Sequence, residues 1–227
     1  MKADWELELS SQSQPINRPH PLAEVLRQVD RQSCPSRFNF HCHTTFSDGS
    51  LGPEALVSQA VELGLEHLAI TDHHSIAAYG PASQFLGTGP GPKLWTGVEI
   101  SCLLEGCLVH VLGLGFDPLH PSLTPYLQGS AVVGTALQAR AVLAAIHGAS
   151  GLALLAHPAR YRLPFATLLE AAAQLGFDGA EAWYDYQMQP SWQPTPHVCE
   201  AIATDLHKRG LLMSCGTDTH GLALDGR

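Results

Sequence analysis

Short apolar runs recur along this chain, and most of them end at or near a histidine or an acidic residue. These polar residues are spread between positions 41 and 220, so they can meet only if the fold brings the ends of the runs together. The strands of a barrel do this, because their carboxyl ends lie on one rim and build a shared site there. The pattern therefore constrains fold and chemistry at once. The residues concerned are His41, His43, Asp48, Asp72, His73, Glu99, His110, His157, Asp218 and His220.

The apolar runs predict seven strands separated by helices. Runs such as 152–156 are apolar throughout, as in parallel strands that helices cover on both faces. Apolar residues with helical spacing lie between the runs, for example after Pro53 and from Ala139 to Ile146, and further helices are expected to end at Gly176 and Gly210. These features indicate an α/β protein with a barrel or a large open sheet. The expected strands are 38–43, 67–72, 94–100, 108–115, 152–156, 180–184 and 211–216.

One connection between these strands is too short for a parallel crossover. Only seven residues separate Ile100 from Leu108, whereas a parallel crossover needs about a dozen or more. We therefore expect an antiparallel hairpin at this point. The hairpin would place Glu99 and His110 at the same end of the sheet, beside the residues that follow the other strands.

The composition indicates one folded domain. The chain has 227 residues, of which 45% are hydrophobic and 15% are charged, so it can bury a sizeable core. Residues 37–227 are expected to form this domain. Residues 1–36 are rich in Ser, Gln and Pro, and we expect a helical or mobile N-terminal extension. The formal net charge of −9 argues against a surface that binds duplex nucleic acid through general basicity.

The cysteines and the apolar runs indicate a location in the cytoplasm. Six cysteines occur without CxxC spacing, which argues against both a zinc knuckle and a disulfide framework. No apolar run approaches the roughly 20 residues that span a bilayer, and the first residues lack a signal-peptide pattern. We expect a cytoplasmic protein without membrane association and without an obligate protein partner.

The polar residues at the strand ends are of the types that bind divalent metal ions. Imidazole and carboxylate groups are ligands for Zn, Mn and Fe, and in His41-x-His43 the strand period of two puts both rings on one face. Asp218-x-His220 repeats this spacing. Six histidines and three carboxylates are too many for one ion and fit two or three. Closely spaced ions that activate water and hold a phosphate ester are typical of hydrolases.

Six segments in the same order resemble the PHP (polymerase and histidinol phosphatase) domain family, and the resemblance covers about residues 38–220. Within the family the chain is most similar to the stand-alone, metal-dependent nucleotide phosphoesterases. The residues around Leu51 and Arg160 are the nearest points of similarity. The six segments are Phe40–Gly49, Ala69–His74, Gly97–Ser101, His110–Gly113, Leu155–Pro158 and Gly216–His220.

This resemblance implies a distorted (β/α)7 barrel with two or three divalent ions (Mn, Zn or Fe). It implies hydrolysis of a phosphate ester of a nucleotide or oligonucleotide, such as a short RNA end, by attack of a metal-bridging hydroxide. Three sets of ligands follow from the matched positions. These sets are His41, His43, Glu99 and Asp218; Asp48, His73 and His220; and Glu99, His110 and His157.

Some residues near the predicted site keep more than one interpretation. Asp48, Asp72 and Arg160 are expected to act in catalysis, and Asp48 is also expected to bind metal. Asp72 either orients a metal-binding imidazole or caps a following helix. Arg160 either contacts a substrate phosphate with its planar guanidinium or forms a surface ion pair. Glu181, at a strand end, lies either at the rim of the site or in ordinary packing.

The chain also departs from its branch of the family. His74 stands where Asp or Asn is usual, the 117–151 connection is short where relatives carry an insertion, and the sequence ends soon after His220. The substrate is therefore less defined than the metal centre. A histidinol-phosphate phosphatase is one alternative. Another is a non-catalytic metal-binding module that docks on a partner protein.

Overall fold

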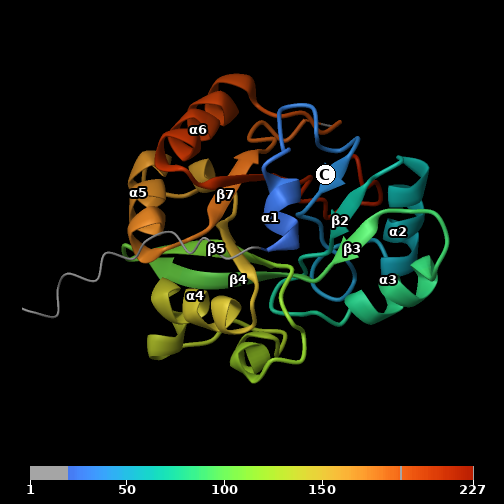
Figure 1. The fold of residues 1–227 in the computed structure, drawn as a ribbon, viewed down its shortest axis with the longest axis horizontal. Helices are drawn as coiled ribbons and strands as arrows, with labels where there is room; N and C mark the ends of the chain where they lie inside the picture. The colour runs from blue at the N-terminus through green and yellow to red at the C-terminus, as the bar shows by residue number, and fades with distance from the viewer. Residues whose placement is uncertain (1–19, 190, 227) are drawn as a thin grey trace, which may run out of the picture.

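The computed structural model describes residues 20–189 and 191–226, which form two β-sheets (Figure 1). In the smaller sheet the parallel strands β1 (Phe38–Asn39), β2 (His67–Ala69) and β3 (Lys93–Trp95) lie side by side. Neither sheet closes on itself, so the α/β class is confirmed but a seven-stranded barrel is not. The larger sheet has the order β4 (Gly97–Leu104), β5 (Cys107–Leu114), β6 (Leu152–Leu155), β7 (Gly179–Trp183) and β8 (Leu212–Cys215).

The predicted hairpin is confirmed. Strands β4 and β5 are antiparallel, with Glu99 opposite Leu112 and Ser101 opposite His110. Strand β5 is also antiparallel to β6, whereas β6, β7 and β8 run parallel to one another. Strand β4 continues to Leu104, so Glu99 lies near its beginning rather than near its end.

The predicted strand 94–100 is wrong in one respect, because the chain changes sheets within it. Strand β3 ends at Trp95 and β4 begins at Gly97. A Cβ atom at Gly97 would lie 2.4 Å from the carbonyl oxygen of Ile70, so only glycine permits this close approach. The hydroxyl of Thr96, between the two strands, donates to the carbonyl of Phe116 at 2.7 Å. The crossing places Glu99 three residues after the switch.

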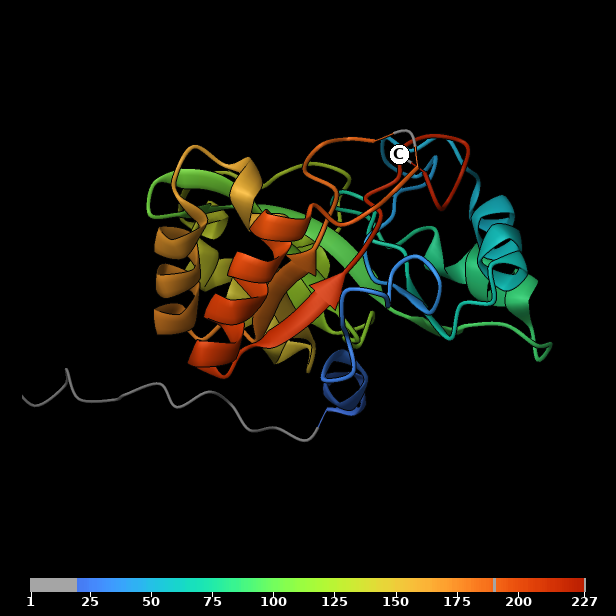
Figure 2. The same ribbon diagram turned by 90° about the horizontal axis from the view of Figure 1, so that it is seen from above.

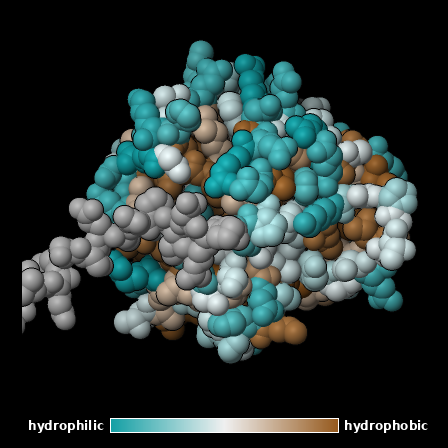
Figure 3. All heavy atoms as spheres, in the orientation of Figure 1, coloured by the Kyte–Doolittle hydropathy of each residue, from teal (hydrophilic) through white to brown (hydrophobic). Residues whose placement is uncertain are grey.

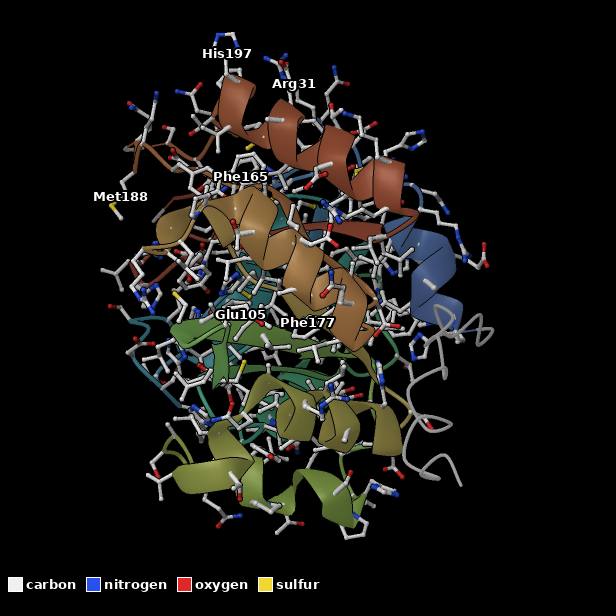
Figure 4. The ribbon with its side chains drawn as sticks, turned by 90° about the vertical axis from the view of Figure 1, so that its left-hand side faces the viewer. Arg31, Glu105, Phe165, Phe177, Met188 and His197 are labelled. Carbon is white, nitrogen blue, oxygen red and sulfur yellow. The ribbon has the colours of Figure 1, made fainter. Side chains whose placement is uncertain are left out.

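The predicted helical segments form helices that cover the sheets. Helices α4, α5 and α6 flank the larger sheet, and in Figure 4 Phe165 and Phe177 mark the two ends of α5. Gly176 and Gly210 follow α5 and α6 with φ of 93° and 68°, which confirms the two predicted helix ends. Helix α3 (Tyr79–Leu86), of whose residues only Ala82 is buried, was not predicted. The other helices are α2 (Pro53–Glu62), α4 (Ala139–Gly148), α5 (Phe165–Leu175) and α6 (Pro196–Arg209), with 3-10 turns at Pro121–Tyr126, Gly134–Leu137 and Pro158–Arg160.

The segment before β1 packs into the main core. Helix α1 (Pro21–Leu26) buries Leu22 and Leu26, and the His20 side chain accepts a hydrogen bond from the backbone N–H of Leu22. His20 also contacts the carbonyl of Gly115 at 3.1 Å, which joins this segment to the end of β5. Residues 1–19 lie outside the described part of the chain, so the expected extension is described only from residue 20.

The described residues form two hydrophobic cores. The smaller core includes Leu56, Val57 and Leu68 and lies beside the smaller sheet and α2. The larger core lies between the larger sheet and its helices, and it also includes residues of α1 and one residue from each strand of the smaller sheet: Phe38, Ala69 and Trp95. Hydrophilic side chains cover most of the coloured surface in Figure 3, with apolar residues visible between them. All six cysteines are buried and unpaired. None of the helices in the described ranges is long and apolar enough to cross a membrane.

Candidate metal centre

The segments that follow β1, β2 and β8 meet at one edge of the two sheets. Cys42 pairs in parallel with Thr219, and His73 pairs in parallel with Glu99. The backbone N–H of Ser50 donates to the carbonyl of His220 at 2.9 Å. Figure 2 shows the C-terminal segment beside the segment that follows β1. These pairings bring the polar ends of both sheets together.

Glu99 lies at the centre of this meeting point and is 1% exposed. Burial opposes ionisation of its carboxyl group, but the surrounding histidines, His41 first, hold the pKa of Glu99 well below its usual range. A charged carboxylate with two oxygens can therefore serve several neighbours. Its Oε2 is 3.2 Å from His41 Nε2, 3.2 Å from His43 Nε2 and 3.4 Å from His73 Nδ1, and its Oε1 is 2.8 Å from His110 Nδ1 and 3.2 Å from His157 Nε2.

The nine predicted metal ligands all lie in one connected cluster. Within each of three sets, the ligand atoms lie within 4.8 Å of one another. His157 is outside these sets but contacts Glu99. The sets overlap at His43, His73 and Glu99, which suits two or three ions that share ligands. They are His41, His43, Glu99 and Asp218; His43, Asp48, His73 and His220; and His73, Glu99 and His110.

The surroundings of one buried nitrogen, His43 Nε2, indicate whether the ligand set of His41, His43, Glu99 and Asp218 fits a cation. His43 Nε2 is 3.2 Å from Glu99 Oε2 and 3.1 Å from Asp218 Oδ1, yet it has no hydrogen-bond partner of acceptable geometry. Buried polar atoms are rarely left in this state in a folded protein. A lone pair beside two buried carboxylate oxygens is the donor set that a divalent cation requires, so these residues fit a metal ion.

The histidines of the cluster differ in how their surroundings shift the pKa. Burial lowers the pKa of His43, but the nearby carboxylates of Asp218 and Glu99 outweigh burial and raise it to about 9. Burial lowers the pKa of His73 to about 4, despite the charge of Glu99. Metal binding at His43 therefore releases a proton, whereas His73 is already neutral at pH 7.

Asp48 and Asp72 have different positions. Asp48 lies on a loop, its side chain is 54% exposed, and its carboxylate is 3.3 Å from His220 and 3.7 Å from His73. Asp72 is buried and accepts hydrogen bonds from Thr44 N at 2.7 Å, from Thr44 Oγ1 at 2.6 Å and from Ser47 Oγ at 2.6 Å. Asp72 therefore fixes the loop that carries Asp48. It does not cap a helix, because α3 begins only at Tyr79.

Arg160 lies beside Asp218 and Tyr184 at the edge of the cluster. Its Nη1 donates to Asp218 Oδ2 at 3.1 Å and to the Tyr184 hydroxyl at 2.9 Å, and its side chain is 37% exposed. The Tyr184 hydroxyl donates to Asp218 Oδ2 at 2.6 Å. Burial, and then the charge of Asp218, raises the pKa of Tyr184, so this hydroxyl stays protonated. These contacts hold Asp218 with its other oxygen toward His41 and His43.

The cluster lines a cavity of about 370 Å³. Its exposed side is formed by Asp48, and the half-buried rings of His73 and His220 lie next to it. Arg160 is a permanent cation in the lining, within reach of an anionic group that enters the cavity. The lining residues are Asp48, His73, Glu99, His110, His157, Arg160, Asp218 and His220.

Two buried residues near the cluster were not predicted to belong to it. Glu181 is fully buried and contacts both His41 and the backbone of His157, whereas its position in sequence was equally compatible with packing. His74, at the unusual position, accepts a hydrogen bond from the backbone N–H of Ser101 at 3.2 Å. His74 therefore supports β4 and lies outside the three ligand sets.

Comparison with known proteins identifies the family. Residues 39–160 match the PHP domain, and the chain belongs to this family. It is 38% identical over 137 residues to a 5′-3′ exoribonuclease of Haemophilus influenzae, which covers 55% of this chain and 50% of that protein. It is 32% identical over 151 residues to a 3′,5′-nucleoside bisphosphate phosphatase of Chromobacterium violaceum, which covers 66% of this chain and 44% of that protein.

A solved structure shows the same fold. The chain superposes on a protein of Bifidobacterium adolescentis, described as a metal-dependent phosphoesterase, with a TM-score of 0.67 and 23% sequence identity. The superposition covers 85% of this chain and 90% of the other. The chain spans about half the length of the curated relatives that it matches.

Proposed function

We propose that this chain hydrolyses a phosphate ester of a nucleotide or oligonucleotide with two or three divalent metal ions. The observation that carries this proposal is the position of Glu99, a buried carboxylate within 3.4 Å of five imidazole rings and at the base of a cavity lined by Arg160. The names of the two curated relatives, which act on RNA and on nucleoside bisphosphates, support a nucleotide-like substrate.

Some residues of the cavity would bind the metal ions, and others would position the substrate phosphate or a ligand. When bound, ions such as Mn²⁺, Zn²⁺ or Fe²⁺ supply a water of lowered pKa and neutralise the charge of a phosphate ester. The three overlapping ligand sets would hold these ions. Arg160 orients the phosphate, and the Asp72-tethered loop holds Asp48 over the cavity.

We also propose that the two sheets are the two parts of a distorted barrel. The isolated pairings of Cys42 with Thr219 and of His73 with Glu99 connect the segments after β1 and β2 to the two edges of the larger sheet, at β8 and β4. The six buried free thiols are in the state that a reducing compartment such as the cytoplasm maintains.

A comparison of substrates tests the proposed function. The purified chain with Mn²⁺ is incubated with a nucleoside 3′,5′-bisphosphate, a 5′-phosphorylated oligoribonucleotide and histidinol phosphate, and kcat/KM is measured for each. We expect a nucleotide substrate to exceed histidinol phosphate at least about tenfold, which corresponds to about 1.4 kcal/mol of transition-state stabilisation. A preference for histidinol phosphate would contradict the proposal. So would metal binding without turnover of any ester, which would favour a docking module.

Replacement of Arg160 by lysine is expected to raise KM about tenfold with a smaller fall in kcat. Lysine keeps the charge but loses the planar set of donors that contacts a phosphate and the Tyr184 hydroxyl together. Arg162 offers a matched control, because it is exposed and donates to the carbonyl of Gly106 instead. Arg162→Lys should leave KM unchanged. If Arg160→Lys lowers only the melting temperature, Arg160 has no role in substrate binding.

A further inference from the structure

We propose that Glu181 is a positioning residue of the metal centre, which fixes the ring of His41 and the backbone of His157 in their metal-binding arrangement. This inference rests on the proposed metal-dependent function. Glu181 is not itself near enough to the cavity to line it, and it acts through the two histidines.

The first contact of Glu181 fixes the tautomer of His41. Its two carboxylate oxygens are 3.1 and 3.3 Å from His41 Nδ1, and both side chains are fully buried. A carboxylate only accepts, so Nδ1 carries a proton. Nε2 is 3.2 Å from Glu99 Oε2 and 3.2 Å from Asp218 Oδ1, so it is the nitrogen whose proton a cation would displace. With Nδ1 held by Glu181, the lone pair of Nε2 would then be directed to the place where the buried ligand set meets.

The second contact of Glu181 fixes His157. Its Oε2 accepts a hydrogen bond of 2.8 Å from the backbone N–H of His157, which directly follows Ala156 after β6. His157 has a φ of 28°, a backbone conformation that a residue with a side chain rarely adopts and that neighbouring contacts must hold. Its Nε2 is 3.2 Å from Glu99 Oε1. One carboxylate thus supports two ligands that lie far apart in the sequence.

An irregularity directly after Glu181 brings a second supporting side chain to the same face. The pairing of β7 with β8 shifts register between Glu181 and Trp183, as in a β-bulge. Regular alternation would put Glu181 and Trp183 on one face. With the extra residue, Glu181 contacts His41 and Tyr184 contacts Asp218, so residues three apart both face the ligands. The bulge therefore adds Tyr184, which directly follows β7, to the face on which Glu181 lies.

The charge of Glu181 distinguishes a metal-supporting role from simple packing. In the described residues Glu181 forms an ion pair only with His41. A neutral glutamine has the same shape and could fill the same space. Its amide N–H, however, can donate to His41 Nδ1 and so favour the tautomer with a proton on Nε2, where a metal would bind. A carboxylate also raises the donor strength of the ring that it contacts.

Metal titration of the Glu181→Gln variant tests the proposal. We expect Mn²⁺ alone, measured by calorimetry on the full chain, to bind at least about tenfold and up to about 100-fold more weakly than to the wild type. The melting temperature of the metal-free variant should remain close to that of the metal-free wild type. Equal Mn²⁺ affinity and stoichiometry in the two proteins would overturn the proposal.

Asp178 provides a matched control at the other end of β7. Its Oδ2 also accepts from an imidazole, His147 Nε2 at 2.8 Å, and from a backbone N–H, that of Ala153 at 2.8 Å, but it lies outside the metal cluster. Asp178→Asn should leave Mn²⁺ affinity unchanged. If both variants lose affinity alike, Glu181 acts only through the stability of β7 and the proposal fails.

A measurement on the wild type keeps the proposal testable if Glu181→Gln does not fold. Nitrogen-15 NMR of the histidine side chains with Zn²⁺ should show a protonated Nδ1 and a metal-bound Nε2 for His41. Coordination through Nδ1 would overturn the proposal. Neither readout requires a substrate, so a chain that binds metal with Glu181 as described but hydrolyses no phosphate ester would refute the proposed function alone.

Discussion

Replacement of Glu99 by glutamine is expected to lower kcat/KM for phosphate ester hydrolysis by more than about 100-fold, a larger loss than supporting residues usually cause. Glu99 contributes to two of the three ligand sets, and its oxygens lie within 3.4 Å of five imidazole nitrogens. Glutamine offers one oxygen and one N–H₂ group, and the latter cannot bind a cation. The loss should appear in kcat, because the missing group acts on the reacting phosphate rather than on distant parts of the substrate.

A second glutamate of the same hairpin provides the control for this variant. Glu105 lies exposed at the turn between β4 and β5 and is labelled in Figure 4. Glu105→Gln should keep full activity. The circular dichroism of Glu99→Gln should match that of the wild type, which shows that the variant is folded. Turnover by a folded Glu99→Gln variant at the wild-type rate would refute the metal centre as we describe it.

Removal of metal ions is expected to reduce hydrolysis to less than about 1% and to lower the melting temperature. Ions at 100 times their dissociation constant stabilise a protein by about 2.7 kcal/mol, which for a chain of this size corresponds to roughly 5–10 °C. The measurement compares calorimetric melting and turnover before dialysis against a chelator, after it, and after Mn²⁺ is restored. The melting temperature and the turnover should both recover when Mn²⁺ is restored.

The Glu99→Gln variant also serves as the reference for metal removal. Its melting temperature should respond to Mn²⁺ much less than that of the wild type, because two ligand sets are incomplete. Hydrolysis that persists after exhaustive chelation would contradict a metal-dependent reaction. If the melting temperature of the wild type does not change when Mn²⁺ is added, this would contradict metal binding at this cluster.

The sequence predicted that distant residues would lie close together, because the order of apolar and polar residues shows where the strands end. Polar residues that close an apolar run share the edge of the sheet at which the strands end, so His157 and Asp218 could be expected close together. The hairpin was predictable from the short connection between Ile100 and Leu108 alone. Both inferences need only the chain itself and the geometry of strands.

The sequence could not predict features that depend on contacts between distant segments. The switch of sheets between Trp95 and Gly97 depends on the approach of Gly97 to the carbonyl of Ile70. The role of Glu181 depends on its contacts with His41 and with the backbone of His157, both far away in the sequence. The Asp72 carboxylate accepts hydrogen bonds from Thr44, a residue 28 positions earlier, rather than from its neighbour His73. In each case tertiary contacts decide what the local pattern leaves open.

The two hydrophobic cores give the ligand cluster a mechanical role. His43 and His73 come from segments beside the smaller core, whereas Glu99 and His157 belong to strands or strand ends of the larger sheet. Cations held between them would fasten one half of the molecule to the other. With the ions bound, the protein would then unfold as one cooperative body. Without them, the part around the smaller core, with α2 and α3, would be joined to the larger core through Phe38, Ala69 and Trp95 and would separate first.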